Sequence, residues 1–336
     1  MEEKIDIVVT WVDGNDPAWL KEKSKYLPGI NTDTSKSRYR DWGLLKYWFR
    51  GIEKYATWVN KMYFVTWGHI PEWLNVDNEK LVIVNHKDYM KEEYLPTFNS
   101  NTILMNLHRI KGLSEKFIVF NDDCYIIDNT NKEDFFINDF PCDNIALNIH
   151  CPQKSNSIQN VCFNDAGIIN EYFDFKKSMN SNKKLWYNIH NGKELLRTII
   201  LSKCPRFPGF YYHHLPQGYI KSTFEKVWKL ESEYLDKVSR NKFRTIEDTN
   251  EWLVKDWQIA EGKVKIRKKK LGKVFFVQDK LMPKQGEEII NYIKKQKGKC
   301  IAINDGHLTG EKSLDYIPKF VEAFAEILPE KSTFEK

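Results

Sequence analysis

Strand-like and helix-like segments alternate along the first 128 residues, and this alternation restricts the possible folds more than any other feature of the chain. The apolar, β-branched runs are IDIVVTWV (5–12), KMYFVTW (61–67) and KLVIVNH (80–86). Runs with helical spacing of apolar residues occur at 42–55 and 100–112. Strands that alternate with helices favour an α/β fold with an open, mostly parallel sheet.

A fourth apolar run, FIVFNDDCYII (117–127), is interrupted by Asn121, Asp122 and Asp123. Adjacent carboxylates repel each other and lose hydration when buried, so a cation, a proton or open solvent has to compensate them. Either one carboxylate caps a turn while the other faces solvent, or one or both hold a divalent cation through oxygen ligands. The flanking apolar residues favour the metal site, at the strand ends where such sheets bind ligands.

The sequence DGNDP follows the first strand. Asp13 and Gly14 are expected to make a turn, and Asp16 is expected to cap a helix that has Pro17 at its first position. The cap explains Asp16 as a structural residue. Asp13 is either a plain turn residue or a carboxylate that faces a bound ligand.

Three arginines, Arg38, Arg40 and Arg109, are candidate anion ligands because guanidinium groups bind phosphate oxygens in bidentate fashion. The alternative for each is a solvated surface charge. Arg109 has the stronger case of the three, since it shares a predicted helix with His108 a few residues before the acidic strand.

Two histidines, His213 and His214, lie in the aromatic segment YYHHLPQGY (211–219). Each is either a hydrogen-bonded packing residue or a general base, a role that suits histidine near neutral pH and is worth about 10²–10⁴ in rate. A second strand-like run, IAIND (301–305), also ends in an Asn-Asp pair, Asn304 and Asp305.

Four regions are expected along the chain: an α/β core at 1–128, a loop-rich insertion at 129–206, the rest of the catalytic domain at 207–310 and a C-terminal amphipathic helix at 311–336. Within the third region we expect a helix over 223–238, with Ser222 and Glu225 as a capping box, and a basic hairpin over 263–280. The hexapeptide KSTFEK occurs at 221 and at 331, but two copies of six residues do not establish a repeat.

Charge and composition exclude several classes of protein. The 52 basic and 46 acidic residues suit an anionic ligand, but the excess is too small to indicate nucleic-acid binding. Without a secretory signal or a membrane-spanning run, we expect a cytoplasmic protein with reduced cysteines. The basic run 263–273 is a solvated face or a peripheral contact with the inner face of the plasma membrane. The residues alone predict a metal-assisted enzyme that acts on a phosphorylated or nucleotide-activated substrate.

Four segments together are similar to a known family. In order, they are IDIVVTWVDGNDP, the long stretch from RYRDWGLLKYWF to EKFIVFNDD, HHLPQGYIKS with NKFRTIED, and IAIND. They resemble the four blocks of the Stealth family, which comprises bacterial capsular polysaccharide phosphotransferases and the animal enzyme that places N-acetylglucosamine-1-phosphate on lysosomal glycans.

This resemblance implies transfer of a hexose- or N-acetylhexosamine-1-phosphate from a UDP-sugar to a glycan hydroxyl, which forms a phosphodiester and releases UMP. It also implies a nucleotide-binding core similar to GT-A glycosyltransferases, dependence on Mg²⁺ or Mn²⁺, and an oligosaccharide acceptor that is lipid-linked. Neutralising phosphate charge and orienting the acceptor hydroxyl are the main demands of such a reaction.

By the same resemblance, Asp122 and Asp123 would hold the metal, Asp13 and Gly14 would lie at the donor, and Arg244, Asp305 and His214 would complete the site. The animal enzyme has a second histidine three residues after the first, where this chain has Gln217. The general base is therefore His214, Asp305 or His213.

Two other functions remain open from the sequence. A retaining, metal-dependent glycosyltransferase that releases UDP would use the same acidic residues on the same type of core. A catalytically inactive carbohydrate-binding or scaffold protein could also retain the fold.

Overall fold

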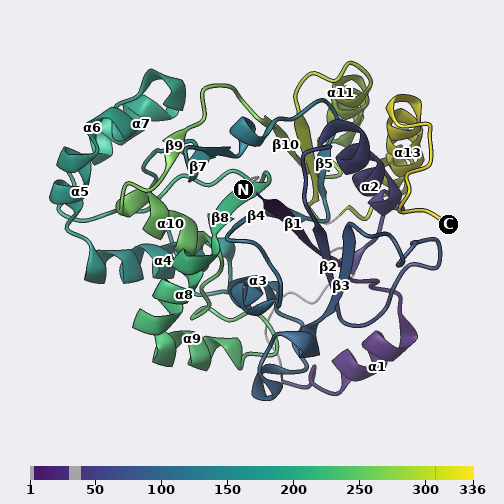
Figure 1. Cartoon of the computed structure of the whole chain (residues 1–336), viewed down its shortest axis with the longest axis horizontal. Helices are drawn as coiled ribbons and strands as arrows, with labels where there is room; N and C mark the ends of the chain where they lie inside the picture. Colours follow the sequence, from purple (N-terminus) through teal and green to yellow (C-terminus); the bar gives the residue numbers. More distant parts are fainter. Residues whose placement is uncertain (1–3, 30–38, 307) are drawn as a thin grey trace.

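The computed structural model describes residues 4–29, 39–306 and 308–336, and Figure 1 shows the chain arranged around a central sheet. This sheet has the strand order β3-β2-β1-β4-β8, with β8 antiparallel to β4 and the other pairs parallel. The strands are β1 (Ile5–Thr10), β2 (Met62–Thr66), β3 (Leu81–Asn85), β4 (Lys116–Asn121) and β8 (Gln217–Ile220). The predicted α/β fold with an open, mostly parallel sheet is confirmed.

Both faces of the central sheet are buried, which explains why its strands are nearly continuous apolar runs. Successive side chains of a strand point to opposite faces. Ile7 and Val9 of β1 accordingly join a core with α2 (Leu45–Tyr55), whereas Val8 between them joins a core on the other face. That second core includes Leu104 of the short helix α3 (Ser100–Met105). The helix expected over 100–112 therefore ends at Met105.

The interrupted run FIVFNDDCYII is two strands in two different sheets. β4 ends at Asn121, Asp122 and Asp123 form a turn, and β5 (Cys124–Ile126) then begins. β5 pairs with β11 (Cys300–Asp305) in a second sheet of order β10-β11-β5. The acidic residues therefore lie where the chain passes from one sheet to the next.

The predicted basic hairpin is wrong. β10 (Gly272–Val277) pairs in parallel with β11, and helix α11 (Met282–Lys294) makes the crossover between them. The short strand β9 (Lys265–Ile266) pairs instead with β7 (Phe140–Asp143), which also pairs with β6 (Phe136–Ile137). Burial of Phe275 and Val277 against the main core outweighs local pairing across the lysine run.

Helices occupy most of residues 158–201, where the sequence predicted loops. They are α4 (Ile158–Tyr172), α5 (Phe175–Ser181), α6 (Lys183–Trp186) and α7 (Glu194–Leu201). α4 packs on α10 (Trp252–Ala260), and its Ile169 is completely buried there. Tertiary packing of a few apolar residues thus stabilises helices whose polar composition suggested none. The division into four regions stays a prediction.

Of three predicted helix features, one is confirmed and two turn out differently. Asp16 does cap α1 (Pro17–Ser24), because its side chain accepts a 2.6 Å hydrogen bond from the Trp19 amide. The predicted helix over 223–238 is two helices, α8 (Lys221–Leu230) and α9 (Ser232–Ser239), and the Ser222 hydroxyl bonds Glu115 rather than forming a capping box. The C-terminal helix is divided at Asp315 into α12 (Glu311–Leu314) and α13 (Tyr316–Ile327).

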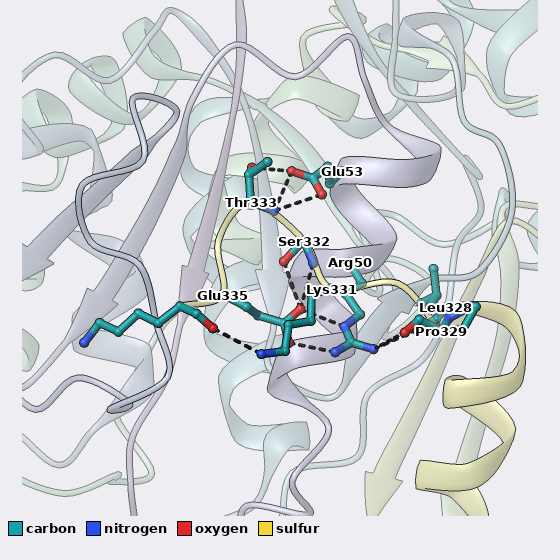
Figure 2. Close-up of polar contacts among 9 residues, drawn as sticks. Arg50, Glu53, Leu328, Pro329, Lys331, Ser332, Thr333 and Glu335 are labelled. Carbon is teal, nitrogen blue, oxygen red and sulfur yellow. Dashed lines mark hydrogen bonds and ion pairs between the residues drawn. The ribbon is translucent and has the colours of Figure 1, made fainter.

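The last residues, 328–336, form a C-terminal strap that crosses α2 (Figure 2). The buried guanidinium of Arg50 makes two 2.7 Å hydrogen bonds to Glu335 and one of 2.9 Å to the Leu328 carbonyl. Phe334 packs on Phe49 of the same helix, with ring centroids 5.4 Å apart. The strap thereby fixes the end of the chain against the core. Among the described residues, no helix combines the length and apolarity needed to cross a membrane.

Candidate active site

A cavity of about 870 Å³ opens at one edge of the two sheets. The residues that follow β1, β2 and β3 line it together with the carboxyl ends of β4 and β11. The strand order reverses between β1 and β4, and open α/β sheets bind their ligands at such a point. β8 runs antiparallel to β4, so the segment before β8 reaches the same edge and brings His214 to the cavity.

Asp123 is the centre of a polar cluster in this cavity. The His214 Nε2 atom lies 2.8 and 2.9 Å from its two carboxylate oxygens, and the Asn304 amide donates a 2.9 Å hydrogen bond to one of them. The Asn121 side-chain nitrogen lies 3.4 Å from Nδ1 of His214. The two Asn-Asp strand ends noticed in the sequence therefore meet at one site.

Asp123 and His214 stabilise each other's charged forms. Burial opposes protonation of His214, but the adjacent Asp123 carboxylate outweighs it, so the pKa of His214 is raised above its ordinary value. Burial likewise opposes ionisation of Asp123, but the charge and hydrogen bond of His214 lower its pKa. Asp123 and His214 thus form an ion pair over an extended pH range.

Asp122 and Asp41 add negative charge to the same cavity. Loss of hydration within the cavity, followed by the charges of Asp123 and Asp41, raises the pKa of Asp122 to about 7. Loss of hydration also raises the pKa of Asp41, which lies nearby and lines the same cavity. The charges of Asp123 and Asp41 thus oppose ionisation of Asp122, and a bound cation relieves such repulsion.

Carboxylate oxygens are the donors that Mg²⁺ and Mn²⁺ prefer, so the residues fit such an ion. Ligand atoms of Asp123, Cys124 and His214 also lie within 4.8 Å of one another. However, the buried Cys124 thiol donates to Asp123, with a sulfur–oxygen distance of 3.3 Å, and burial raises its pKa well above the ordinary value. A protonated thiol is a poor metal ligand, so the fit rests on the carboxylates.

Two of the predicted cationic residues line the cavity. Arg40 lies 3.1 Å from one Asp305 oxygen and donates a 3.0 Å hydrogen bond to the Leu308 carbonyl. Arg244 donates a 2.5 Å hydrogen bond to the Ser100 hydroxyl. Asp305 is thus held by Arg40, and Arg38 lies outside the described residues.

The turn after β1 is close to the cavity, but Asp13, Gly14 and Asp16 do not line it. The Asp13 amide donates a 2.9 Å hydrogen bond to His69, and its carboxylate accepts one from the Asn15 amide. A Cβ atom at Gly14 would lie 2.1 Å from the Tyr39 carbonyl oxygen, so close packing requires glycine there. A donor role for this turn stays a prediction.

Arg109 lies away from the cavity, in a separate surface pocket. Its guanidinium stacks over Trp228 at 4.4 Å and donates a 3.0 Å hydrogen bond to Asn106. His108 is buried beside it, and loss of hydration lowers its pKa to about 3. Arg109 precedes β4 and therefore lies near the amino end of that strand. Asn121 is at the carboxyl end, roughly 17 Å away along the six-residue strand. Closeness in sequence was therefore misleading.

The segment before β8 is held by a buried ionic network. His213 bonds Asp143 at 2.9 Å, and Lys255 lies 3.1 Å from the other oxygen of the same carboxylate. His213 does not line the cavity. It is therefore placed to orient its neighbour His214 rather than to meet a ligand.

Sequence reasoning missed a carboxyl group in the wall of the cavity. Glu251 is 5% exposed, and its Oε2 atom has no hydrogen-bond partner among the described residues. Burial raises its pKa to about 7. Its local sequence, EDTNEW, is rich in acids, and nothing in the pattern distinguishes Glu251 from its exposed neighbour Glu247.

Comparisons with known proteins show which family this chain belongs to. Residues 3–30 match the model of Stealth protein conserved region 1, and residues 38–143 match that of conserved region 2. The chain is 43% identical to the capsular polysaccharide phosphotransferase WcwK of Streptococcus pneumoniae, over 99% of this chain and 98% of the relative. It is 39% identical to the receptor polysaccharide phosphotransferase WefC of Streptococcus gordonii, over the full length of both.

Among solved structures, the galactosyltransferase LgtC in complex with donor and acceptor sugar analogues is similar at a TM-score of 0.39 and 9% identity, over 98% of each chain. That similarity is too low to assign a reaction. The full-length sequence relationships are decisive: this chain belongs to the Stealth family and is an enzyme of the phosphotransferase type.

Proposed function

We propose that this enzyme transfers a hexose- or N-acetylhexosamine-1-phosphate from a UDP-sugar to a hydroxyl of a glycan, in the synthesis of a bacterial surface polysaccharide. The observation that carries the proposal is the cluster of Asp122, Asp123 and His214 at the strand-end cavity. A cavity of about 870 Å³ is large enough for a nucleotide sugar. The names of the relatives support the phosphotransfer and the polysaccharide product.

Asp122 and Asp123 would hold a Mg²⁺ or Mn²⁺ ion, which supplies neutralisation of phosphate charge when bound. Arg40 and Arg244 line the same cavity and offer guanidinium groups to phosphate oxygens. In-line attack by the acceptor hydroxyl at the β-phosphorus forms the new P–O bond, breaks the bond to the bridging oxygen and releases UMP. The chain's own residues thus bind the diphosphate and orient the nucleophile.

His214 is the residue we assign as the general base. Of the three candidates, His213 is turned toward Asp143 and Asp305 is held by Arg40, whereas His214 lines the cavity beside the acids. Its neutral form accepts the proton of the attacking hydroxyl, and Asn121 and Asp123 fix the orientation of its ring. The acceptor is proposed to be a lipid-linked oligosaccharide, reached from the cytoplasmic face of the membrane.

The nucleotide released in the reaction tests this function. Purified enzyme is incubated with Mg²⁺, a panel of UDP-sugars and capsule-type oligosaccharides, and the products are resolved by anion-exchange chromatography and phosphorus NMR. UMP together with a phosphodiester signal is the expected result. Release of UDP would instead identify a glycosyltransferase, and calorimetry without metal-dependent UDP-sugar binding would indicate an inactive binding protein.

A further inference from the structure

Two groups of residues from different parts of the chain line the cavity. Residues that follow β1 and β2, including Trp11, Val12 and Trp67, line the side next to the β1–β4 crevice, where a nucleotide is expected in this type of sheet. A second group of lining residues, here called the insertion wall, comprises His150, Gln159, Tyr212, Glu251 and Trp252, which are joined by ring stacking, a hydrogen bond and chain continuity. The phosphotransferase reaction needs two substrates, a sugar donor and a glycan acceptor. The crevice between β1 and β4 is the expected site of the donor nucleotide, which leaves the site of the acceptor to be assigned.

The insertion wall carries a carboxyl group, one oxygen of which has no hydrogen-bond partner among the described residues. Glu251 immediately precedes α10 as its N-cap residue and lines the cavity, with only 5% of its surface exposed and without a hydrogen bond to Oε2 among the described residues. Buried polar atoms in native proteins are nearly always hydrogen-bonded, and leaving one unsatisfied costs about 1–3 kcal/mol. A ligand that donates a hydrogen bond would supply the missing partner.

The rest of the insertion wall is a rigid aromatic surface. The Tyr212 and Trp252 rings stack with centroids 4.4 Å apart, and His150 lies 5.3 Å from Tyr212. His150 is fixed by Gln159 at 3.2 Å and by the Phe210 carbonyl at 2.9 Å, while the Tyr212 hydroxyl bonds the buried Asp256. These aromatic groups are therefore already held in place before a ligand binds.

Aromatic rings beside a carboxyl group suit an uncharged sugar. The C–H faces of a pyranose ring pack on aromatic side chains, and its hydroxyl groups donate hydrogen bonds to carboxyl oxygens. A carboxylate without a bound cation would instead repel the phosphates of a nucleotide donor. We infer that the insertion wall is the acceptor subsite, which binds a hexopyranoside with one of its hydroxyl groups on Glu251. This inference rests on the proposed function, because it assigns the second substrate of that reaction.

Binding of simple glycosides tests the subsite separately from catalysis. Methyl β-galactopyranoside and methyl N-acetyl-β-glucosaminide are used as probes in saturation-transfer NMR with the full chain, UDP and Mg²⁺. We expect wild type to bind one of them and Glu251→Ala and Trp252→Ala to weaken that binding by about tenfold or more, because each removes a direct contact. The affinity for UDP, measured by calorimetry, should change less than about twofold in both variants, because neither side chain is expected to contact the nucleotide. A twofold change corresponds to less free energy than one hydrogen bond contributes.

Glu247→Gln is the matched control, since Glu247 is exposed on the same segment and its ion pair with Lys237 is solvated. Removing a buried carboxyl group with one unsatisfied oxygen should not prevent folding, and circular dichroism checks this for each variant. Three results would overturn the inference: no glycoside binding to wild type, unchanged glycoside binding in both variants, or displacement of the glycoside by UDP-sugar but not by UDP. Failure of the proposed function would appear separately, as absence of UMP in the transfer assay.

Discussion

The Nε2 atom of His214 lies 2.8 Å from a carboxylate oxygen of Asp123, and this contact joins residues that are 91 positions apart in the sequence. Each member stabilises the charged form of the other, so the pKa of His214 is raised and that of Asp123 is lowered. The pair connects the turn between the two sheets with the segment before β8. The proposed chemistry depends on this connection.

Removing either carboxylate of the turn should abolish most activity. We expect Asp122→Asn and Asp123→Asn to lower kcat by at least about 100-fold, because each loses a negatively charged oxygen ligand for the cation. Product formation is measured at saturating UDP-sugar. Asp77→Asn is the control, since Asp77 is an exposed aspartate far along the chain from the turn. Full activity of both turn variants in folded protein would contradict the metal assignment.

The pH dependence of the rate should report the state of His214. A general base has to be neutral, so kcat/KM is expected to rise with pH until the pH exceeds the raised pKa of His214, above its ordinary value of 6.5. In Asp123→Asn the residual activity should reach its plateau at lower pH, because the charge that raises this pKa is gone. A pH–rate profile that is identical in the two proteins would argue against His214 as the base.

The metal dependence should distinguish the carboxylates from the thiol. Chelation with EDTA is expected to abolish UDP-sugar binding, and Mg²⁺ or Mn²⁺ should restore it. Cys124→Ser should keep the same half-maximal Mg²⁺ concentration, because the buried thiol of Cys124 stays protonated and donates to Asp123. Calorimetric titration with each ion measures the effect. A large loss of Mg²⁺ affinity in Cys124→Ser would show that the sulfur is a ligand.

The stability of the enzyme should depend on the buried Glu251. Its pKa is about 7 in the folded protein and 4.5 as the ordinary value, so the folded state binds the proton more tightly than the unfolded state does. The free energy of unfolding therefore falls as pH rises from about 4.5 to 7, by roughly 3 kcal/mol from this group. Glu251→Gln should lack this part of the decrease. Urea unfolding at pH 5 and pH 8 compares the two proteins, and equal pH dependence would contradict the assignment.

The C-terminal strap should contribute measurably to stability. Arg50→Ala leaves the mostly buried Glu335 carboxylate without its main partner, and we expect a loss of about 3 kcal/mol. Faster amide hydrogen exchange in residues 328–336 should accompany this loss. Lys273→Ala is the comparison, because its ion pair with Glu288 is exposed and is worth about 0–1 kcal/mol. Similar stability of the two variants would mean that the strap is not coupled to the core.

Interactions between segments account for the parts of the site that could not be predicted. The Asn-Asp ends of β4 and β11 were recognisable because a polar pair after an apolar strand marks a ligand-binding edge. Glu251 was not recognisable, since only the fold places it against the cavity while its neighbour Glu247 remains exposed. Arg109 was misassigned because position along the chain does not say which end of β4 it is near.

The sequence by itself determined the parallel α/β sheet and its acidic edge, because continuous apolar runs and helical spacing of apolar residues act within a few positions. Tertiary structure decided the rest, as the hexapeptide KSTFEK demonstrates. At 221–226 it lies in helix α8 with Phe224 buried, whereas at 331–336 it lies in the strap, where Phe334 packs on Phe49 and Glu335 binds Arg50. Identical residues adopt two conformations because the partners that bury each phenylalanine come from distant parts of the chain.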